Sequence, residues 1–222
     1  AVIFGLSVLL KLLPLIFLPL FFRYFIRRNS VEKITGTGKL FSYYLIVLLV
    51  VLLGFLPFLS LEAVANFGSS IGLWFQKFEF NASVYYLIRE IGYWMKGYNV
   101  IGTVGKILPV LVFFFILGIA FFRKNRTINQ LLTAFLFAVS AYFFLSTTVH
   151  PWYLATPLLL CIFTRFRFPL VWSLVVVVSY TAYASPEFQE NLWLVALEYL
   201  IVFGVLILEV FFRKKVSHQL NI

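Results

Sequence analysis

The chain has 222 residues, of which 63% are hydrophobic and only 12% are charged. A soluble domain carries about 25% charged residues, and a water-soluble fold of this size has too little interior to hide so much apolar surface. The composition therefore excludes an ordinary soluble domain and indicates lipid as the solvent for most side chains. The formal net charge of +10 would indicate nucleic acid in a soluble protein. Here the basic residues lie in short clusters between apolar runs, which is typical of a membrane protein that binds no nucleic acid.

Seven apolar runs come near the roughly 20 residues that a helix needs to cross a bilayer core of about 30 Å. Because backbone polar groups cannot stay unpaired in hydrocarbon, each run is expected to be helical. We therefore expect an all-α fold, a polytopic transmembrane bundle of about seven spans that forms a single domain over residues 1–222. The fifth and sixth runs are short, and one of them could be re-entrant. The runs are 1–22, 40–59, 100–122, 128–146, 152–164, 168–183 and 192–212.

Lysine and arginine are distributed unequally between alternate connections of these runs. Basic residues favour cytoplasmic loops, so the connections rich in them are expected to be cytoplasmic, together with the C-terminus. The basic clusters fall in 23–39, 123–126, 165–167 and 213–215. The alternate connections, which are poorer in basic residues and hold most of the acids, are expected to face outward: 60–99, 147–151 and 184–191.

Two ionisable residues fall within predicted spans, Lys11 three residues before Pro14 and Glu198 in the last run. A charge inside the membrane is costly and is by default a hypothesis of a functional site. Lys11 could instead face protein, or lie closer to the edge of the span. An ion pair between Lys11 and Glu198 is one option that the sequence leaves open. Glu209, near the end of the last run, is expected to pair with Arg213 one helical turn later.

The long segment 60–99 mixes many aromatic residues with charged ones. This mixture suits amphipathic helices that lie in the membrane interface, where aromatic rings favour the headgroup level. Long ordered loops usually carry function.

Within that segment, a helix after Ser83 would place Tyr85 and Arg89 on one face, and Tyr86 and Glu90 on another. Arginine binds phosphate through its planar fork, so this region could hold a lipid phosphate. The alternative is an amphipathic helix whose charged ends reach the interface. The triplet Asn81-Ala82-Ser83 also fits the sequon for N-glycosylation.

A second outward feature, Thr147–Tyr153, joins the fourth and fifth runs. Pro151 prevents helix continuation and favours an extended conformation at His150, which would present this side chain at the outer surface. Histidine is the side chain that can donate or accept a proton near neutral pH. The alternative is a plain turn in which Trp152 and Tyr153 serve as interfacial anchors.

Several kinds of catalytic site are excluded by the residues that are missing. The chain contains no Asp, and its one cysteine, Cys161, lies in an apolar run. A nucleotide-sugar metal site built on two Asp residues is therefore excluded, and no spacing of Cys and His indicates a metal centre. Any catalytic carboxylate in these residues must be a Glu, and Glu62 and Glu79 are the outward candidates.

Three stretches resemble a known family. Lys-Leu-Leu-Pro-Leu-Ile-Phe-Leu-Pro at 11–19, Lys-Phe-Glu-Phe-Asn-Ala-Ser-Val-Tyr-Tyr-Leu-Ile-Arg at 77–89 and Val-His-Pro-Trp-Tyr at 149–153 resemble bacterial polytopic mannosyltransferases of the GT-C glycosyltransferase superfamily. The nearest likeness is to the Bacteroidetes-type group, related to enzymes that depend on polyprenyl- or dolichyl-phosphate mannose. It runs along most of the chain.

The resemblance implies an enzyme of the bacterial inner membrane that needs no cofactor or metal. A polyprenyl-phosphate donor would bring the sugar to the outward face. The carboxylate of an acidic residue would act as base on the hydroxyl of a glycan or lipid acceptor, and cationic groups would stabilise the departing phosphate. The implied phosphate ligands are Arg89, His150 and Lys77. The residues implied to shape the pocket around donor and acceptor are Glu79, Asn81, Tyr85, Tyr86, Trp152 and Tyr153.

The family's usual catalytic acid lies upstream of residue 1, so the resemblance leaves the catalytic base unassigned. The chain begins with Ala1 inside an apolar run too long for a signal peptide. We therefore expect the C-terminal part of a larger membrane domain, inactive when expressed alone.

Three other functions remain open from the residues. A transporter or lipid flippase would need polar or broken helices near the midplane, for which Lys11, Pro14 and Glu198 are the only indications. An O-antigen polymerase or ligase would also carry a large outward loop. A structural membrane subunit would need no site at all.

Overall fold

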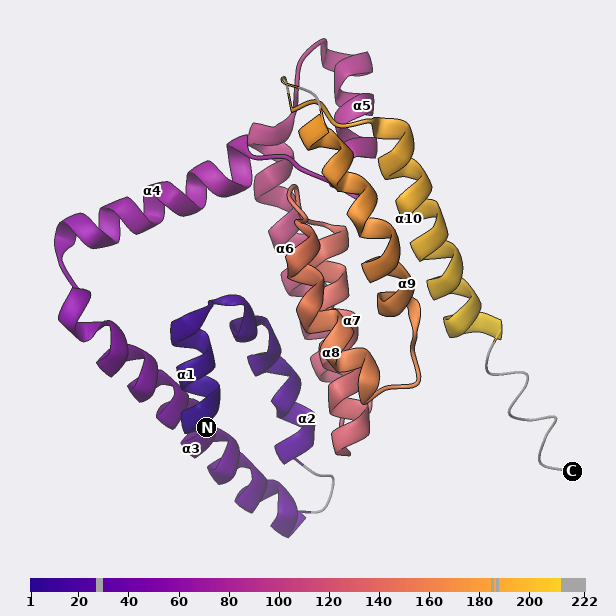
Figure 1. The fold of residues 1–222 in the computed structure, drawn as a ribbon. Coiled ribbons are helices and arrows are strands. Elements are labelled where there is room, and N and C mark those ends of the chain that lie inside the picture. The colour runs from indigo at the N-terminus through magenta and orange to yellow at the C-terminus, as the bar shows by residue number, and fades with distance from the viewer. Residues whose placement is uncertain (27–29, 185, 187, 213–222) are drawn as a thin grey trace, which may run out of the picture.

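The computed structural model describes residues 1–26, 30–184, 186 and 188–212 (Figure 1). Within these residues the chain is almost entirely helical, and its β-structure is limited to one isolated bridge. Three helices are long and apolar enough to cross a bilayer: Ile34–Phe58, Ile101–Phe122 and Leu192–Phe212. Four shorter apolar helices are Leu13–Phe25, Ile128–Phe144, Pro151–Ile162 and Phe168–Ala184. The all-α class is confirmed, and the three long apolar helices are consistent with a membrane protein.

The first predicted run, residues 1–22, is not one helix. Helix α1 (Val2–Leu10) ends at Lys11, whose backbone is extended, and the chain continues as the 3-10 helix η1 (Leu13–Phe21) and the short helix α2 (Phe22–Phe25). Pro14 and Pro19 both lie in η1, where their missing N–H groups and ring sterics disfavour a regular α-helix. Figure 1 shows the two parts as the arms of a hairpin. The expectation of one continuous span here is therefore corrected to a chain reversal.

Helix α3 (Ser30–Phe55), continued by η2 (Leu56–Phe58), packs against α1. Two helices then fill the long segment 60–99. Helix α4 (Leu61–Lys77) begins where the Ser60 hydroxyl accepts a hydrogen bond from Ala63 N at 3.0 Å, and α5 (Val84–Lys96) ends at Gly97, which has the left-handed φ of 77°. In Figure 1, α4 leads from the end of α3 across to the bundle, and α5 projects at its upper end.

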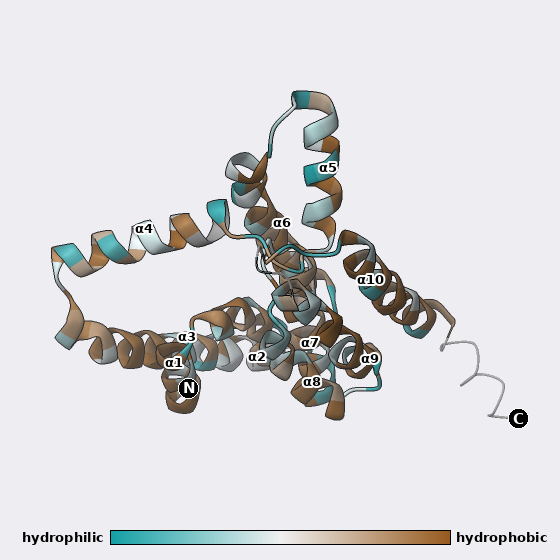
Figure 2. Cartoon of the chain, turned by 45° about the horizontal axis from the view of Figure 1, so that its top comes forward, coloured by the Kyte–Doolittle hydropathy of each residue, from teal (hydrophilic) through white to brown (hydrophobic). Residues whose placement is uncertain are grey.

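The rest of the chain forms the bundle itself. Its elements are α6 (Ile101–Phe122), α7 (Ile128–Phe144), η3 (Pro151–Leu154), α8 (Ala155–Ile162), α9 (Phe168–Val175), η4 (Val176–Ala184), α10 (Leu192–Ile207) and the π-helical turn η5 (Leu208–Phe212). The core includes Trp172, which is 0% exposed and stacks on Phe144 with ring centroids 4.5 Å apart. Outward positions are also apolar, as the brown surfaces of the helices in Figure 2 show, because lipid rather than water is their expected surroundings.

Glu209 fastens the last helix to α9. Its carboxylate accepts hydrogen bonds from the backbone N–H of Arg167 at 2.7 Å and of Phe168 at 2.9 Å. Negative charge at the N-terminus of a helix is stabilising. The predicted partner Arg213 lies outside the described residues, so that pairing is not tested.

Two glycines of α3 give a matched test of the packing between α2 and α3. A Cβ on Gly36 would lie 2.1 Å from the carbonyl oxygen of Phe25, whereas a Cβ on Gly38 would meet nothing within 4 Å. We expect Gly36→Ala to lower stability by about 1–3 kcal/mol through overpacking. Gly38→Ala should raise it by about 0.5–1 kcal/mol, since glycine is unfavourable inside a helix. Thermal unfolding in detergent measures both, and equal melting temperatures for the two variants would contradict this packing.

Candidate functional site

The extended segment 78–83, between α4 and α5, joins two parts of the chain that are distant in sequence. Phe80 N donates to Thr147 O at 3.0 Å, and Val149 N donates to Phe80 O at 2.8 Å, which forms the isolated parallel bridge. The Thr148 hydroxyl adds a bond to Phe78 O at 3.1 Å. The segments 60–99 and 147–151, which the sequence predicts on one side, therefore meet.

Asn81 extends this junction to the segment that precedes α10. Its backbone N donates to Glu190 Oε1 at 2.7 Å, its side-chain Nδ2 donates to Glu198 Oε1 at 3.1 Å, and its carbonyl accepts from the Tyr199 hydroxyl at 2.7 Å. Its φ of 45° is left-handed, a conformation that asparagine tolerates better than most residues. Since Asn81 is 0% exposed, the sequon at 81–83 is inaccessible to a glycosylating enzyme in the folded protein.

Glu198 is 2% exposed and lies inside the bundle. Its Oε1 accepts from Asn81 Nδ2 and from Trp172 Nε1, both at 3.1 Å. The ion pair with Lys11 that the sequence left open is not formed. Glu198 instead connects α10 to α9 and to the segment 78–83, so its role in this structure is to hold the junction together.

Arg89 belongs to a network of carboxylates and amides on α5. Its guanidinium bonds Glu79 Oε2 at 3.1 Å and Glu90 Oε1 at 3.0 Å, and it lies 4.3 Å from the centroid of the Tyr86 ring. Asn99 Nδ2 donates to the other oxygen of Glu79 at 2.9 Å. The fork expected to bind phosphate is thus occupied by two carboxylates, and both oxygens of Glu79 are engaged.

The remaining predicted residues of this region separate into buried and exposed ones. The hydroxyl of the buried Tyr85 donates to Asn99 Oδ1 at 2.9 Å, which extends the Glu79 network. Lys77 is exposed at the end of α4. The structure therefore brings Glu79, Tyr85, Tyr86 and Arg89 together and leaves Lys77 apart from their hydrogen bonds.

Glu190 is a residue of this junction that the sequence analysis did not single out. It accepts hydrogen bonds from the Tyr86 hydroxyl and from the backbone of Asn81. Burial raises the pKa of Glu190, and these hydrogen bonds offset the effect only in part. Burial, followed by the nearby charge of Glu190, also raises the pKa of Tyr86, which keeps its hydroxyl a donor. The sequence feature that could have indicated Glu190 is its position as an acid in the short predicted outward connection 184–191.

His150 lies within a stack of aromatic rings. Its ring centroid is 4.9 Å from that of Phe80 and 4.4 Å from that of Trp152, and it meets Tyr153 edge-on at 5.2 Å. Its backbone is extended, with φ −79° and ψ 147°, as Pro151 predicts. Burial lowers the pKa of His150, so at neutral pH the imidazole is uncharged. It can donate or accept one hydrogen bond, but it is not a permanent cation.

A hollow of about 360 Å³ opens beside this stack, a size within the range of small-molecule sites. The residues that line it are Lys11, Leu12, Leu13, Ile16, Tyr142, Phe143, Thr148 and Tyr153. The exposed Lys11 extends its ammonium group over the Tyr153 ring, 4.8 Å from the centroid. Among the described residues, neither Lys11 nor the hydroxyls of Tyr142 and Tyr153 have an acidic partner. A lysine, two tyrosines and Thr148 thus line a cavity whose other lining residues are apolar.

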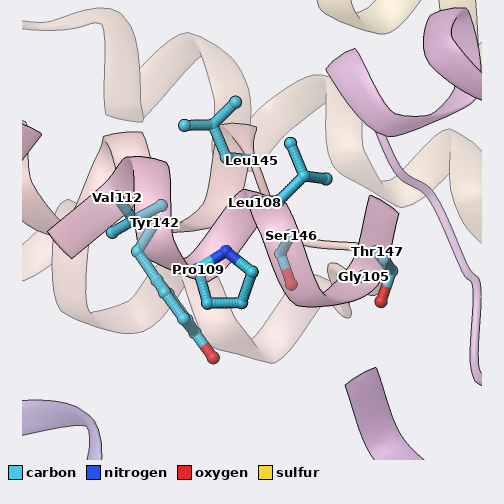
Figure 3. Close-up of a pocket in the computed structure, with 8 residues that line it drawn as sticks. All are labelled: Gly105, Leu108, Pro109, Val112, Tyr142, Leu145, Ser146 and Thr147. Carbon is cyan, nitrogen blue, oxygen red and sulfur yellow. The ribbon is translucent and has the colours of Figure 1, made fainter. Parts of the chain in front are cut away.

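A much smaller cavity of about 10 Å³ lies on the other side of Tyr142 (Figure 3). The close-up shows Pro109 between Tyr142 on one side and Ser146 and Thr147 on the other. Its volume suffices for at most about one water molecule, so it is no substrate site. Within the described residues, no cluster of three His, Cys or Glu side chains could hold a metal ion.

Comparison of the chain with protein-family models, with curated proteins and with solved structures finds no match. The functional argument therefore rests on the residues and their geometry.

The raised pKa of Glu190 predicts a pH dependence of stability. Because burial disfavours the ionised carboxylate, the folded state keeps the proton to higher pH than the unfolded state. The stability is fully present below the unfolded pKa of about 4.3 and is lost as pH rises through the folded pKa. Glu190→Gln should remove this loss, since a glutamine still bonds Tyr86 and Asn81 N.

Melting temperatures between about pH 4 and pH 7 in detergent measure this effect. The wild-type value should fall relative to that of Glu190→Gln as pH rises, and the exposed control Glu62→Gln should follow the wild type. Parallel curves for wild type and Glu190→Gln would show that Glu190 is not buried as described.

Proposed function

We propose that the chain belongs to a membrane glycosyltransferase that transfers a sugar from a polyprenyl-phosphate donor to a glycan or lipid acceptor at the extracytoplasmic face. Mannose is the proposed sugar, on the resemblance to the GT-C superfamily. The observation that carries this proposal is the hollow beside His150. It is lined by Lys11, Tyr142, Tyr153 and Thr148 together with four apolar side chains, which suits a lipid phosphate carrying a sugar.

The proposed membrane arrangement keeps the seven apolar segments, of which the first is the chain reversal at Lys11 and the other six cross the membrane, with α4 and α5 at the outer interface. It places the connections 123–126 and 165–167 and the C-terminus in the cytoplasm of a bacterial inner membrane. Two observations support it. The three segments predicted to face outward meet at Asn81 and Phe80, and the basic connections hold Arg123 and Arg165, which line one common hollow. The predicted outward connections and the basic connections thus lie at opposite ends of the helical bundle.

The proposed reaction is a displacement at the anomeric carbon. The acceptor hydroxyl attacks that carbon, the bond from carbon to the phosphate oxygen breaks, and the lipid phosphate leaves with additional negative charge. Lys11, aided by the hydroxyls of Tyr142 and Tyr153, would stabilise that charge, because electrostatic stabilisation acts most strongly where charge develops. A neutral His150 would contribute a hydrogen bond to donor or acceptor.

In this proposal Arg89 and Glu79 are positioning residues. Their mutual ion pair and the Asn99 contact fix the start of α5 next to Phe80, on which His150 stacks. The base that accepts the proton of the acceptor hydroxyl is assigned to neither of the outward candidates, Glu62 and Glu79.

A transporter or flippase is a second candidate, because the break at Lys11 resembles the interrupted helices that transporters use to bind charged groups. It predicts movement of a lipid-linked sugar across the bilayer without transfer of the sugar. Membrane vesicles that contain the protein, assayed both for sugar transfer and for movement of the lipid-linked sugar, separate the two functions.

We expect Lys11→Gln, made in the complete protein, to lower the initial rate of sugar transfer from polyprenyl-phosphate mannose by about 10²–10³-fold, the usual cost of removing one group that stabilises developing charge. Lys106→Gln is the matched control, since Lys106 is also an exposed lysine, on α6, but does not line the hollow. It should retain the wild-type rate. Wild-type transfer by Lys11→Gln, at equal protein level, would remove the hollow from the mechanism.

Sealed vesicles of the two orientations test the side on which the site lies. A water-soluble acceptor that cannot cross the membrane should be glycosylated when added outside right-side-out vesicles and not when added outside inverted ones. The opposite result would place the hollow on the cytoplasmic side.

A further inference from the structure

A second, larger hollow lies at the end of the bundle where the basic connections meet. Its volume is about 490 Å³. It is lined by Arg123, Asn129, Gln130, Thr133, Phe137, Arg165, Phe166 and Val210. Of these described residues none is acidic, and the polar ones are donors of hydrogen bonds or hydroxyls. This composition favours an anion.

Arg123 is held rigidly toward this hollow by neutral groups. Its Nη1 donates to Asn125 Oδ1 at 3.1 Å and to Gln130 O at 2.9 Å. The buried Asn125 in turn donates to Ile119 O at 3.0 Å. Burial, and then the charge of Arg165, lower the pKa of Arg123. The two guanidinium groups thus line one hollow, and an anion between them would favour the charged form of both.

The N-terminus of α7 adds to the positive potential. Thr127 and Gln130 form a capping box, in which the Thr127 hydroxyl accepts from Gln130 N and Gln130 Oε1 accepts from Thr127 N. Asn129 and Thr133 follow within the first turns and line the hollow. The first turns of this 17-residue helix, which carry the positive end of its dipole, therefore flank the same cavity as the two arginines.

The opposite wall is apolar. Phe137, Phe166 and Val210 line it, and the Arg165 guanidinium lies 5.2 Å from the centroid of the Phe166 ring. A ligand that combines a phosphate with an aliphatic stem would place each part against a matching surface.

We infer that this hollow binds the phosphate group of an anionic lipid headgroup or of a soluble phosphate ester, with Arg123 and Arg165 as its ligands. Planar guanidinium groups form paired, charge-assisted hydrogen bonds with phosphate. This site lies at the other end of the bundle from the hollow at Lys11 and does not depend on the proposed sugar transfer.

Native mass spectrometry of the detergent-solubilised protein tests this inference, with dioleoyl phosphatidic acid in one arm and glycerol 3-phosphate in the other. Loss of one charge-assisted hydrogen bond should weaken binding about tenfold or more. We expect that loss in both Arg165→Gln and Arg123→Gln. The exposed Lys124→Gln, which removes the same charge beside the hollow without lining it, should stay within about twofold of wild type, since surface charges contribute little.

Binding of either probe that depends on the arginines supports the site. If the wild type binds both probes, the phosphate group itself is the feature that is recognised. If it binds phosphatidic acid alone, the ligand is an anionic lipid. The inference is overturned if neither probe binds the wild type above phosphatidylcholine or glycerol. It is equally overturned if Lys124→Gln weakens binding as much as Arg165→Gln.

Discussion

The arrangement of this protein depends on one buried polar junction at Asn81. A polar side chain inside an apolar bundle is costly unless its hydrogen bonds are formed, and here the backbone N, the backbone O and the Nδ2 atom of Asn81 all have partners. Those partners come from the segment before α10 and from α10 itself. Because the penalty is incurred whenever the bonds are broken, the segment 78–83 is confined to a single position between the helices.

The functional geometry follows from that position. Phe80, one residue before Asn81, pairs with Thr148 and supports the ring of His150. Glu79, one residue earlier, is held by Arg89 and Asn99. The hollow in which Lys11 faces Tyr153 lies next to this stack. A lipid-linked sugar would thus meet a surface set by hydrogen bonds within the protein, which is the preorganisation that electrostatic catalysis requires.

Periodic and compositional features of the sequence predicted much of this fold. Hydropathy predicted the all-α class, and the alternation of basic clusters predicted that 60–99 and 147–151 face the same side, a prediction with which the bridge between Phe80 and Thr148 is consistent. Pro151 correctly predicted the extended backbone of His150, since proline restricts its predecessor locally. The chain reversal at Lys11 was missed, because a hydropathy sum cannot separate one long helix from two short apolar ones.

The partners of individual charged side chains could not be predicted from the sequence, for a different reason. The spacing of Tyr85 and Arg89 indicates a shared helix face, but only the fold shows that Glu79 and Glu90 occupy the guanidinium of Arg89. Glu190 lies more than 100 positions from Tyr86, and no local pattern links two residues so far apart. Long-range pairing is decided by how helices pack, and burial then raises the pKa of a carboxyl group such as that of Glu190.

A double-mutant cycle between Asn81 and Glu198 tests the central junction most directly. The free energy of unfolding in micelles would be measured for wild type, Asn81→Ala, Glu198→Met and the double variant. Residues in one hydrogen-bond network show coupling of about 0.5–3 kcal/mol, and we expect a coupling energy in that range for Asn81 and Glu198. As a control, the effects of Asn81→Ala and of the exposed Glu62→Ala on the free energy of unfolding should be additive. Additive effects of Asn81→Ala and Glu198→Met would contradict the junction on which the site is built.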